Sequence, residues 1–201
     1  MKAVRQAAFV YGRRNRIRKA RFALLIAERV NAHSALLVGV SGTRNPVNNL
    51  IEDKLARNLA FVVASGISGD CDGWDRFVAA DGRLLPFRDQ AFDLVYANAV
   101  IEHVGGLEDQ QRFVEEIARV GRAWIITTPN RWFPIEAHRH TFFTHWMPGW
   151  APRGGITRLL GVRDLKEIAP LGQVKGLPLL SPTLTVVGVS PPRTGSPTDD
   201  A

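Results

Sequence analysis

Short apolar runs alternate with helical patterns along most of this 201-residue chain, and this alternation restricts the fold more than any other feature. Each run has the length of a strand and ends at glycine, proline or polar residues. Most are almost continuously apolar, as strands are when both faces of their sheet are buried. Such an alternation predicts a Rossmann-like α/β fold, with a mostly parallel sheet covered by helices on both faces. The five runs are AHSALLVGV, NLAFVVAS, RFVAADG, AFDLVYANA and RAWIITTPN.

Helical patterns occupy the segments between these runs. Hydrophobic residues recur at helical spacing over residues 20–30, 46–58 and 107–120, and Gly121 follows the last as a stop signal. A further helix is expected around residues 156–168, before a last strand at LTVVGVS. The expected organisation is a basic helical arm (1–31), one α/β domain (32–190) and a disordered tail (191–201).

The positive charge of the chain is concentrated at its beginning. The net charge is +7, but eight lysines and arginines precede the first acid, Glu28, and the rest of the chain is almost neutral. A basic arm of this kind can contact an anionic membrane surface, nucleic acid or an acidic partner. It can equally be a solvated helix face, so charge alone does not make this a nucleic-acid protein.

The sequence offers no long apolar run and few cysteines. No transmembrane segment or secretion signal is expected, because the apolar runs are short and bounded by charged or turn residues. Cys71 is the only cysteine, which excludes an internal disulfide and favours a cytoplasmic location.

Small and polar residues stand where the expected strands end. Gly39–Thr43, Ser65, Asp81 and Ala97–Asn98 each close a successive strand. In open parallel sheets, ligands bind outside the carboxyl ends of the strands. These residues are therefore expected to line one crevice.

Two longer motifs support a family resemblance. The segment DGRLLPFRDQAFDLVYANAVIEHVG (81–105) resembles the type 11 branch of the class I S-adenosylmethionine-dependent methyltransferases. The segment FVEEIARVGRAWIITTPNRWFPIEAHRHTFFTHWMP (113–148) is similar to the helix, fifth strand and histidine-containing loop of a bacterial subgroup. The resemblance implies a seven-stranded sheet, S-adenosylmethionine as cofactor, and methyl transfer to a small-molecule or lipid-like acceptor.

The resemblance also implies a set of cofactor-binding residues. Asp81 would accept a hydrogen bond from the adenine amino group, whereas a turn-forming Asp-Gly pair is the structural alternative. Ala97 and Asn98 would lie near the methionine part, and Ser65 would stand at the ribose. The loop under the cofactor's amino-acid end would contain Gly39, Val40, Ser41, Gly42 and Thr43, and the backbone of Gly82 and Arg83 would lie beside Asp81.

Two departures from the family pattern weaken the expected cofactor site. Leu37 occupies the position of the usual acid before the glycine loop, and Ser65 replaces the acid that ends the second strand. Each loss removes a hydrogen-bond acceptor worth about 0.5–3 kcal/mol, so affinity would fall by about two or three decades. The alternative is a degenerate protein that keeps the fold as a non-catalytic binding module. Asp70, Asp72 or Asp75 can also supply the missing acceptor.

Methyl transfer depends mainly on positioning, and a base helps only where the acceptor must lose a proton. His103, beside Glu102, is the candidate for this catalytic role, and a histidine packed against the next helix is the alternative. The aromatic and histidine-rich segment after the fifth strand is expected to cap the pocket, either as an acceptor site or as a structural lid. It contains Trp132, Phe133, Phe142, Phe143 and Trp146.

Other functional classes receive less support. A metal site from Glu136, His138, His140 and His145 lacks an obvious completing ligand, and DCDGWD has its glycine misplaced for a calcium loop. We therefore expect no metal. A nicotinamide dehydrogenase of the short-chain type is disfavoured because no lysine stands four residues after Tyr96. An RNA methyltransferase would depend on the basic arm alone.

Overall fold

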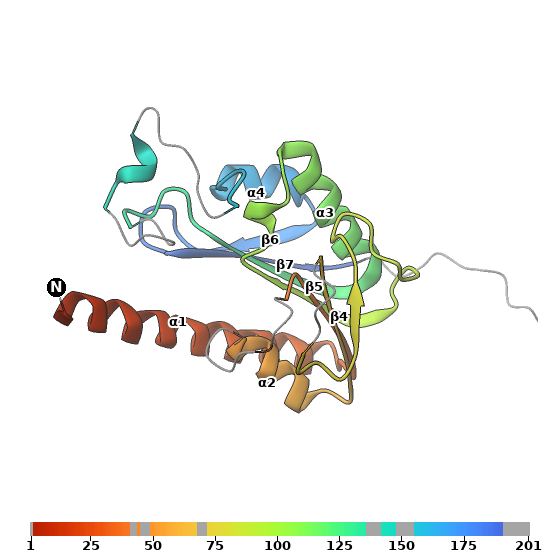
Figure 1. Cartoon of the computed structure of the whole chain (residues 1–201). Helices are drawn as coiled ribbons and strands as arrows, with labels where there is room; N and C mark the ends of the chain where they lie inside the picture. Colours follow the sequence, from red (N-terminus) through yellow and green to blue (C-terminus); the bar gives the residue numbers. More distant parts are fainter. Residues whose placement is uncertain are drawn as a thin grey trace, which may run out of the picture.

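The structure, a computed structural model, describes residues 2–40, 44, 49–67, 72–135, 142–147 and 155–190. Helices lie on both faces of one central sheet (Figure 1). The helices are α1 (Lys2–Arg29), α2 (Leu50–Asn58), α3 (Leu107–Val120) and α4 (Val162–Ile168), with short 3-10 helices η1 (Ile101–His103) and η2 (Thr144–Trp146). The strands are β1 (Ser34–Val38), β2 (Phe61–Gly66), β3 (Phe77–Ala79), β4 (Phe92–Asn98), β5 (Gly121–Pro129), β6 (Gly172–Lys175) and β7 (Thr183–Val189).

Within the described residues, the sheet has seven strands in the order β3-β2-β1-β4-β5-β7-β6. The first five strands are parallel, whereas β7 runs antiparallel to both β5 and β6. The strand order reverses between β1 and β4, and in folds of this type ligands bind at such a reversal. The prediction of a mostly parallel, seven-stranded sheet with helices on both faces is confirmed.

Alternate residues of the central strands enter two different hydrophobic layers. On β4, Val95 and Ala97 pack in the layer that contains α3 and α4, and Leu94 and Tyr96 pack in the layer with α1 and α2. Figure 1 shows these two pairs of helices on opposite sides of the sheet. Because successive strand residues point to opposite faces, both layers need apolar side chains, and the strands read as continuous apolar runs.

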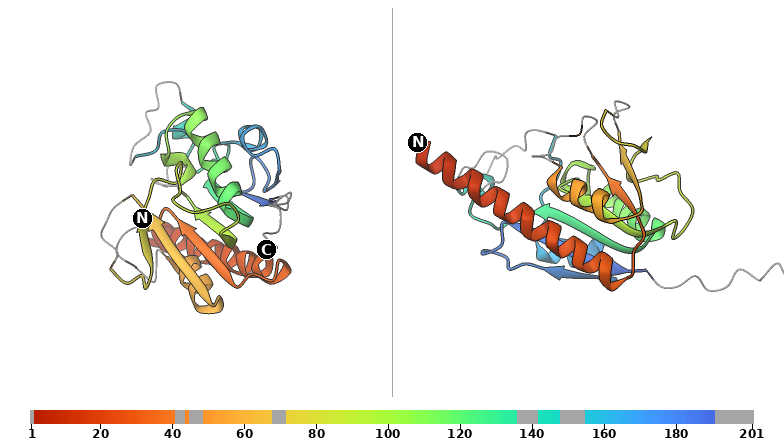
Figure 2. Two further views of the ribbon diagram at one scale, coloured as in Figure 1. Left: turned by 90° about the vertical axis from the view of Figure 1, so that its right-hand side faces the viewer. Right: turned by 90° about the horizontal axis from the view of Figure 1, so that it is seen from below.

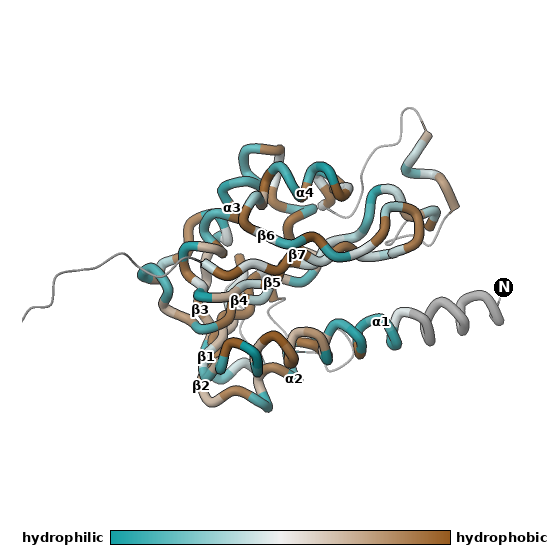
Figure 3. Tube along the Cα trace, turned by 180° about the vertical axis from the view of Figure 1, so that it is seen from behind, coloured by the Kyte–Doolittle hydropathy of each residue, from teal (hydrophilic) through white to brown (hydrophobic). Residues whose placement is uncertain are grey.

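The first helix is much longer than the 20–30 segment expected from its apolar residues. Its C-terminal half packs into the core through Ala20, Ala23, Ile26 and Ala27. Figure 3 shows hydrophobic residues in this half, beside α2. The N-terminal half extends beyond the sheet (Figure 2). Its arginines and lysines have good intrinsic helix propensity, although they give no apolar periodicity.

The C-terminal part of the chain differs from expectation at two points. The helix expected over 156–168 begins only at Val162, because Leu160 bridges to Asn130 and the carbonyl of Leu160 accepts from Arg131 N. Strand β6 was not expected, since its sequence GQVK is polar and its side chains are exposed in alternation. The proposed domain boundary at residue 31 stays a prediction, and the tail 191–201 lies outside the described residues.

Candidate functional site

The carboxyl ends of the central strands align in one row. Val38 pairs with Ser65 on one side and with Ala97 on the other, and Asn98 pairs with Thr127. The residues predicted at the strand ends are thus neighbours across the sheet. Asp81 follows β3, which pairs with the end of β2. The row provides the edge on which a ligand of a parallel sheet would lie.

The loop after β1 is held tightly against the end of β2. The backbone N–H groups of Gly39 and Val40 both donate to the carbonyl of Ser65, at 2.8 and 3.0 Å. Gly39 has φ +76°, and a Cβ there would collide with the side chain of Val100. Only glycine fits such a position without strain. Ser41, Gly42 and Thr43, the rest of the predicted loop, lie outside the described residues.

Ser65 turns its side chain into the protein. It is fully buried, and its hydroxyl donates a long hydrogen bond of 3.5 Å to the carbonyl of Leu37. Ala97 is also fully buried and packs in the layer with α3 and α4. Among the predicted site residues, these two contribute no exposed polar group to the crevice.

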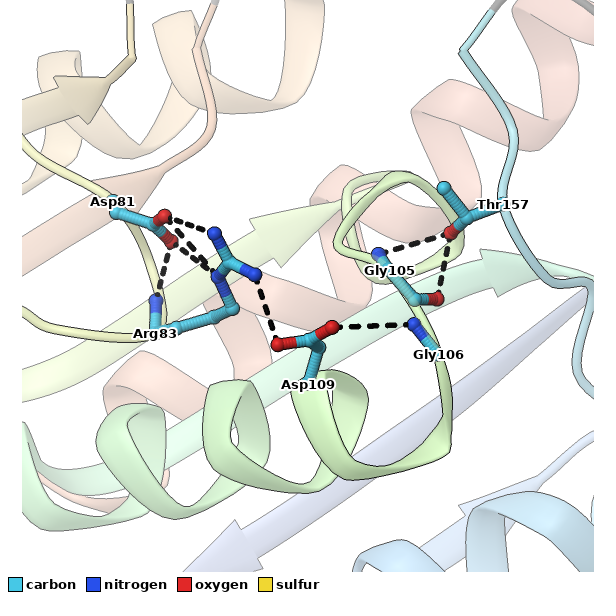
Figure 4. Close-up of polar contacts among 6 residues, drawn as sticks. All are labelled: Asp81, Arg83, Gly105, Gly106, Asp109 and Thr157. Atoms are coloured by element: carbon cyan, nitrogen blue, oxygen red, sulfur yellow. Dashed lines mark hydrogen bonds and ion pairs between the residues drawn. The ribbon is translucent and has the colours of Figure 1, made fainter.

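Asp81 accepts several hydrogen bonds at this edge (Figure 4). Its carboxylate accepts from Arg83 N at 2.9 Å and from Arg83 Nε and Nη2, the latter at 2.6 Å. These hydrogen bonds lower the pKa of Asp81 and keep it ionised. The side chains are 36% and 37% exposed, so water screens the ion pair and the pair can rearrange for a ligand.

The same arginine links Asp81 to the start of α3. Arg83 Nη1 donates to Asp109 Oδ1 at 2.9 Å, and the other oxygen of Asp109 accepts from Gly106 N at 3.4 Å (Figure 4). Nearby, the Thr157 hydroxyl accepts from Gly105 N and donates to Gly105 O at 2.7 Å. Gly82 lies against Phe113 of α3, where a Cβ would come within 2.5 Å of the ring. The loop after β3, the loop after β4 and α3 are therefore connected at this edge.

A polar cluster that the sequence did not reveal lies at the end of β4. Lys19 Nζ of α1 donates to Asn98 Oδ1 at 2.8 Å, and Thr127 Oγ1 donates to the same oxygen at 2.8 Å. On its other side, Asn98 Nδ2 donates to Glu52 Oε1 of α2 at 3.2 Å. The cluster therefore joins the first two helices to the end of the sheet through one carboxamide. We call Lys19, Glu52 and Asn98 the β4-end cluster.

Burial perturbs the charges of this cluster. It lowers the pKa of Lys19 to about 8, against the opposing charges of Glu52 and Glu102. Burial also raises the pKa of Glu52, against its hydrogen bonds and the charge of Lys19. The pKa of the fully buried Tyr96 is raised well above its usual value, first by burial and then by Glu52. Perturbed groups gathered at a ligand-binding edge are typical of functional sites.

His103 lies in η1, immediately after the end of β4. Its side chain is partly exposed, and Nε2 is 4.0 Å from Oε1 of the fully buried Glu102. The other oxygen of Glu102 accepts from Thr128 Oγ1 at 3.1 Å. The acid thus connects the histidine to the end of β5.

The aromatic segment is only partly described. Phe143 and Trp146 have ring centroids 5.0 Å apart, and Trp132 and Trp146 are 6.3 Å apart. Phe142, Phe143 and Trp132 are between 45% and 64% exposed. Glu136, His138 and His140 lie outside the described residues, as do Asp70 and Cys71. Within the described ranges, no three histidine, cysteine or acidic side chains are grouped closely enough to hold a metal ion.

The strand order and the antiparallel β7 define a Rossmann-like fold of the methyltransferase type. The family described as "Methyltransferase domain" matches residues 51–123, the part that contains Asp81 and the end of β4. This match agrees with the resemblance inferred from the two motifs. The match and the fold together bear out this resemblance to the class I methyltransferases.

Solved structures show the same architecture. Magnesium protoporphyrin IX methyltransferase from Synechocystis PCC 6803, with bound SAH, matches with a TM-score of 0.61 and 14% identity, over 90% of this chain and 84% of that one. A protein of Pyrococcus horikoshii OT3 matches with a TM-score of 0.57 and 16% identity, over 89% and 91%. A methyltransferase from Methanosarcina mazei matches with a TM-score of 0.54 and 15% identity, over 78% and 92%. At these identities the likeness establishes the fold. No curated protein sequence matches the chain significantly.

Proposed function

We propose that the protein is a methyltransferase that transfers a methyl group from S-adenosylmethionine to a small-molecule or lipid-like acceptor. The observation that carries this proposal is the alignment of Asp81, Gly39 and Asn98 at the carboxyl edge of a methyltransferase-type sheet. Asp81 is an ionised, solvent-accessible acceptor for the adenine amino group, with the backbone of Gly82 and Arg83 beside it.

The residues fit the cofactor at its two ends. At the adenine end, the turn formed with Arg83 N leaves the Asp81 carboxylate partly exposed, so it can accept a further hydrogen bond. At the amino-acid end, Oε2 of the buried Glu52 has no hydrogen-bond partner among the described residues. Such an orphaned acceptor is costly unless a ligand or water satisfies it. The ribose is the weakest fit, because Ser65 is buried and directed away.

When bound, S-adenosylmethionine supplies a methyl group on a sulfonium, which a nucleophile of the acceptor attacks in line. The residues of the protein bind and orient the cofactor and the acceptor, and they exclude water from the site. His103, next to the end of β4, is our candidate for accepting a proton from an acceptor that must lose one, and Glu102 would orient it. Acceptors that must lose a proton include thiols, amines and hydroxyl groups.

The exposed aromatic segment supports a lipid-like acceptor. The N-terminal half of α1 and the segment that contains η2 extend from the same end of the sheet (Figures 1 and 2). Arg13, Arg14 and Arg18 on α1 are exposed, as are Phe142 and Trp146 in the segment. Basic and aromatic side chains together suit an anionic membrane surface. No helix in the described part of the chain is long and apolar enough to cross a membrane.

Sedimentation with vesicles tests this surface contact. Vesicles containing about 30% phosphatidylserine should bind the protein, and pure phosphatidylcholine vesicles should not. Loss of binding on charge reversal of Arg13, Arg14 and Arg18 would support the contact. Retention of a single-stranded RNA in preference to the anionic vesicles would favour nucleic acid instead. The cytoplasmic location expected from the single cysteine stays a prediction.

Calorimetric titration with S-adenosylmethionine and S-adenosylhomocysteine tests the proposed function. Binding in the micromolar range that Asp81→Ala weakens at least tenfold would support a working cofactor site. A folded wild-type protein that binds neither compound at millimolar concentration would overturn the proposal. It would favour the alternative, a methyltransferase fold retained as a non-catalytic binding module, for which the inward-turned Ser65 is the specific observation.

A further inference from the structure

The β4-end cluster has the chemistry of a site for an amino acid. The amino-acid end of the proposed cofactor carries an ammonium and a carboxylate on one carbon. A protein group that binds it needs a charged donor and a charged acceptor a short distance apart. Lys19 and Glu52 provide this pair, and Asn98 lies between them with hydrogen bonds to both.

The orientation of the bridging carboxamide is determined by its neighbours. Lysine donates hydrogen bonds and cannot accept them, so the oxygen of Asn98 must face Lys19. The nitrogen of Asn98 then faces Glu52, which accepts through Oε1. Thr127 from β5 donates a further bond to the Asn98 oxygen and holds the carboxamide in place. The two charged groups are therefore kept apart at fixed positions.

One acceptor of the cluster is unfilled. Glu52 is only 5% exposed, and its Oε2 receives no hydrogen bond from any residue that the structure describes. Lys19 and Asn98 remain partly exposed, so the cluster can be reached from outside. A buried carboxylate oxygen that lacks a hydrogen-bond donor, beside an accessible ammonium, indicates a binding site for a charged ligand.

The position of Glu52 also compensates for a departure seen in the sequence. Leu37 stands where the related enzymes carry an acid, and it is fully buried in the layer with α1 and α2. Glu52 belongs to α2, which packs in the same layer through Ile51 and Leu55. A negative charge absent from β1 is thus present on α2, which contributes to the same layer.

We propose that Lys19, Asn98 and Glu52 bind the amino-acid end of the cofactor, with Lys19 on its carboxylate and Glu52 on its ammonium. This inference rests on the proposed function. It makes the first helix a part of the cofactor site rather than an appendage. A purely structural role, in which the cluster only docks α1 on the sheet, is the competing explanation.

Two ligands distinguish these explanations. S-Adenosylhomocysteine has the amino-acid end, whereas 5′-methylthioadenosine has the adenosine part and the sulfur but lacks it. Lys19→Met and Glu52→Gln should each weaken S-adenosylhomocysteine binding by about 10- to 100-fold, the loss expected for a charged hydrogen bond. The dissociation constant of 5′-methylthioadenosine should stay unchanged. Lys54→Met and Glu28→Gln, at exposed positions of α2 and α1, are matched controls.

Each outcome is decisive. If the variants lose affinity equally for both ligands, or for neither, the inference is overturned and the proposed function is left intact. Absence of binding in the wild-type protein would overturn both. Circular dichroism verifies that each variant is folded. If Lys19→Met or Glu52→Gln fails to fold, Lys19→Arg and Glu52→Asp preserve the charge and alter the reach. They should still weaken S-adenosylhomocysteine selectively.

Discussion

The half-buried Lys19 of α1 predicts a particular pH dependence of stability. The pKa of Lys19 is about 8 in the folded protein, because burial disfavours its charged form. A lysine in the unfolded chain has a pKa of about 10.4. Between these values the unfolded state binds more protons, so the free energy of unfolding rises with pH. At about 1.4 kcal/mol per pKa unit the full gain would be about 3 kcal/mol. Partial exposure of Lys19 reduces it, and we expect about 1–2 kcal/mol.

Urea unfolding at pH 7, 8, 9 and 10 measures this gain. The relevant quantity is the difference in the free energy of unfolding between the wild-type protein and Lys19→Met. The contributions of other groups that titrate in this range cancel in this difference. From pH 7 to pH 10, the free energy of unfolding of the wild type should rise by about 1–2 kcal/mol relative to that of Lys19→Met. Lys54→Met, at an exposed position, should show no such change. Stability curves that stay parallel for the wild type and Lys19→Met would refute the reasoning.

Three further predictions concern the frame of the site. Gly39→Ala should lower the free energy of unfolding by about 2–4 kcal/mol, and adding Val100→Ala should restore part of it, because strain and a collision both contribute; urea unfolding of both variants measures this. Phe113→Ala should cost about 3–5 kcal/mol in the same assay, since the ring is fully buried, and a cost below about 1 kcal/mol would contradict the packing. Hydrogen bonds from Arg119 lower the pKa of Glu116, so its contribution is present above about pH 4.5 and is lost as pH falls. Glu116→Gln should therefore cost about 1 kcal/mol at pH 7 and almost nothing near pH 2, and an equal cost at both pH values would show that charge is not involved.

The central sheet was predictable because its strands are buried on both faces. Strands such as β4 and β5 are mostly apolar runs, and their length and the residues that end them can be read from the sequence alone. Strand β6 has no such run, since it is a polar strand at the edge of the sheet, paired with β7 within the described part of the chain. Its pairing depends on the neighbouring strand rather than on its own composition, and a single sequence gives little sign of it.

The proposed site could be predicted only where its residues follow strands directly. Asp81 and Asn98 are candidates from the sequence because they stand at strand ends inside a longer motif. Lys19 was missed because its partner Asn98 lies 79 positions away in the sequence and meets it only through packing of α1. Glu52 looks like an ordinary helix acid beside Ile51, and nothing in its spacing distinguishes a buried carboxylate from an exposed one. Long-range packing, which pattern analysis does not capture, decides both cases.

The most direct test of the account is a crystal structure of the protein with S-adenosylhomocysteine. We predict the adenine amino group at Asp81 and the amino-acid end at the β4-end cluster, with Glu52 Oε2 accepting from the ligand. The ligand would then lie across the aligned ends of β1, β2 and β4. Density for the ligand elsewhere, or an amino-acid end directed away from Lys19 and Glu52, would contradict this account.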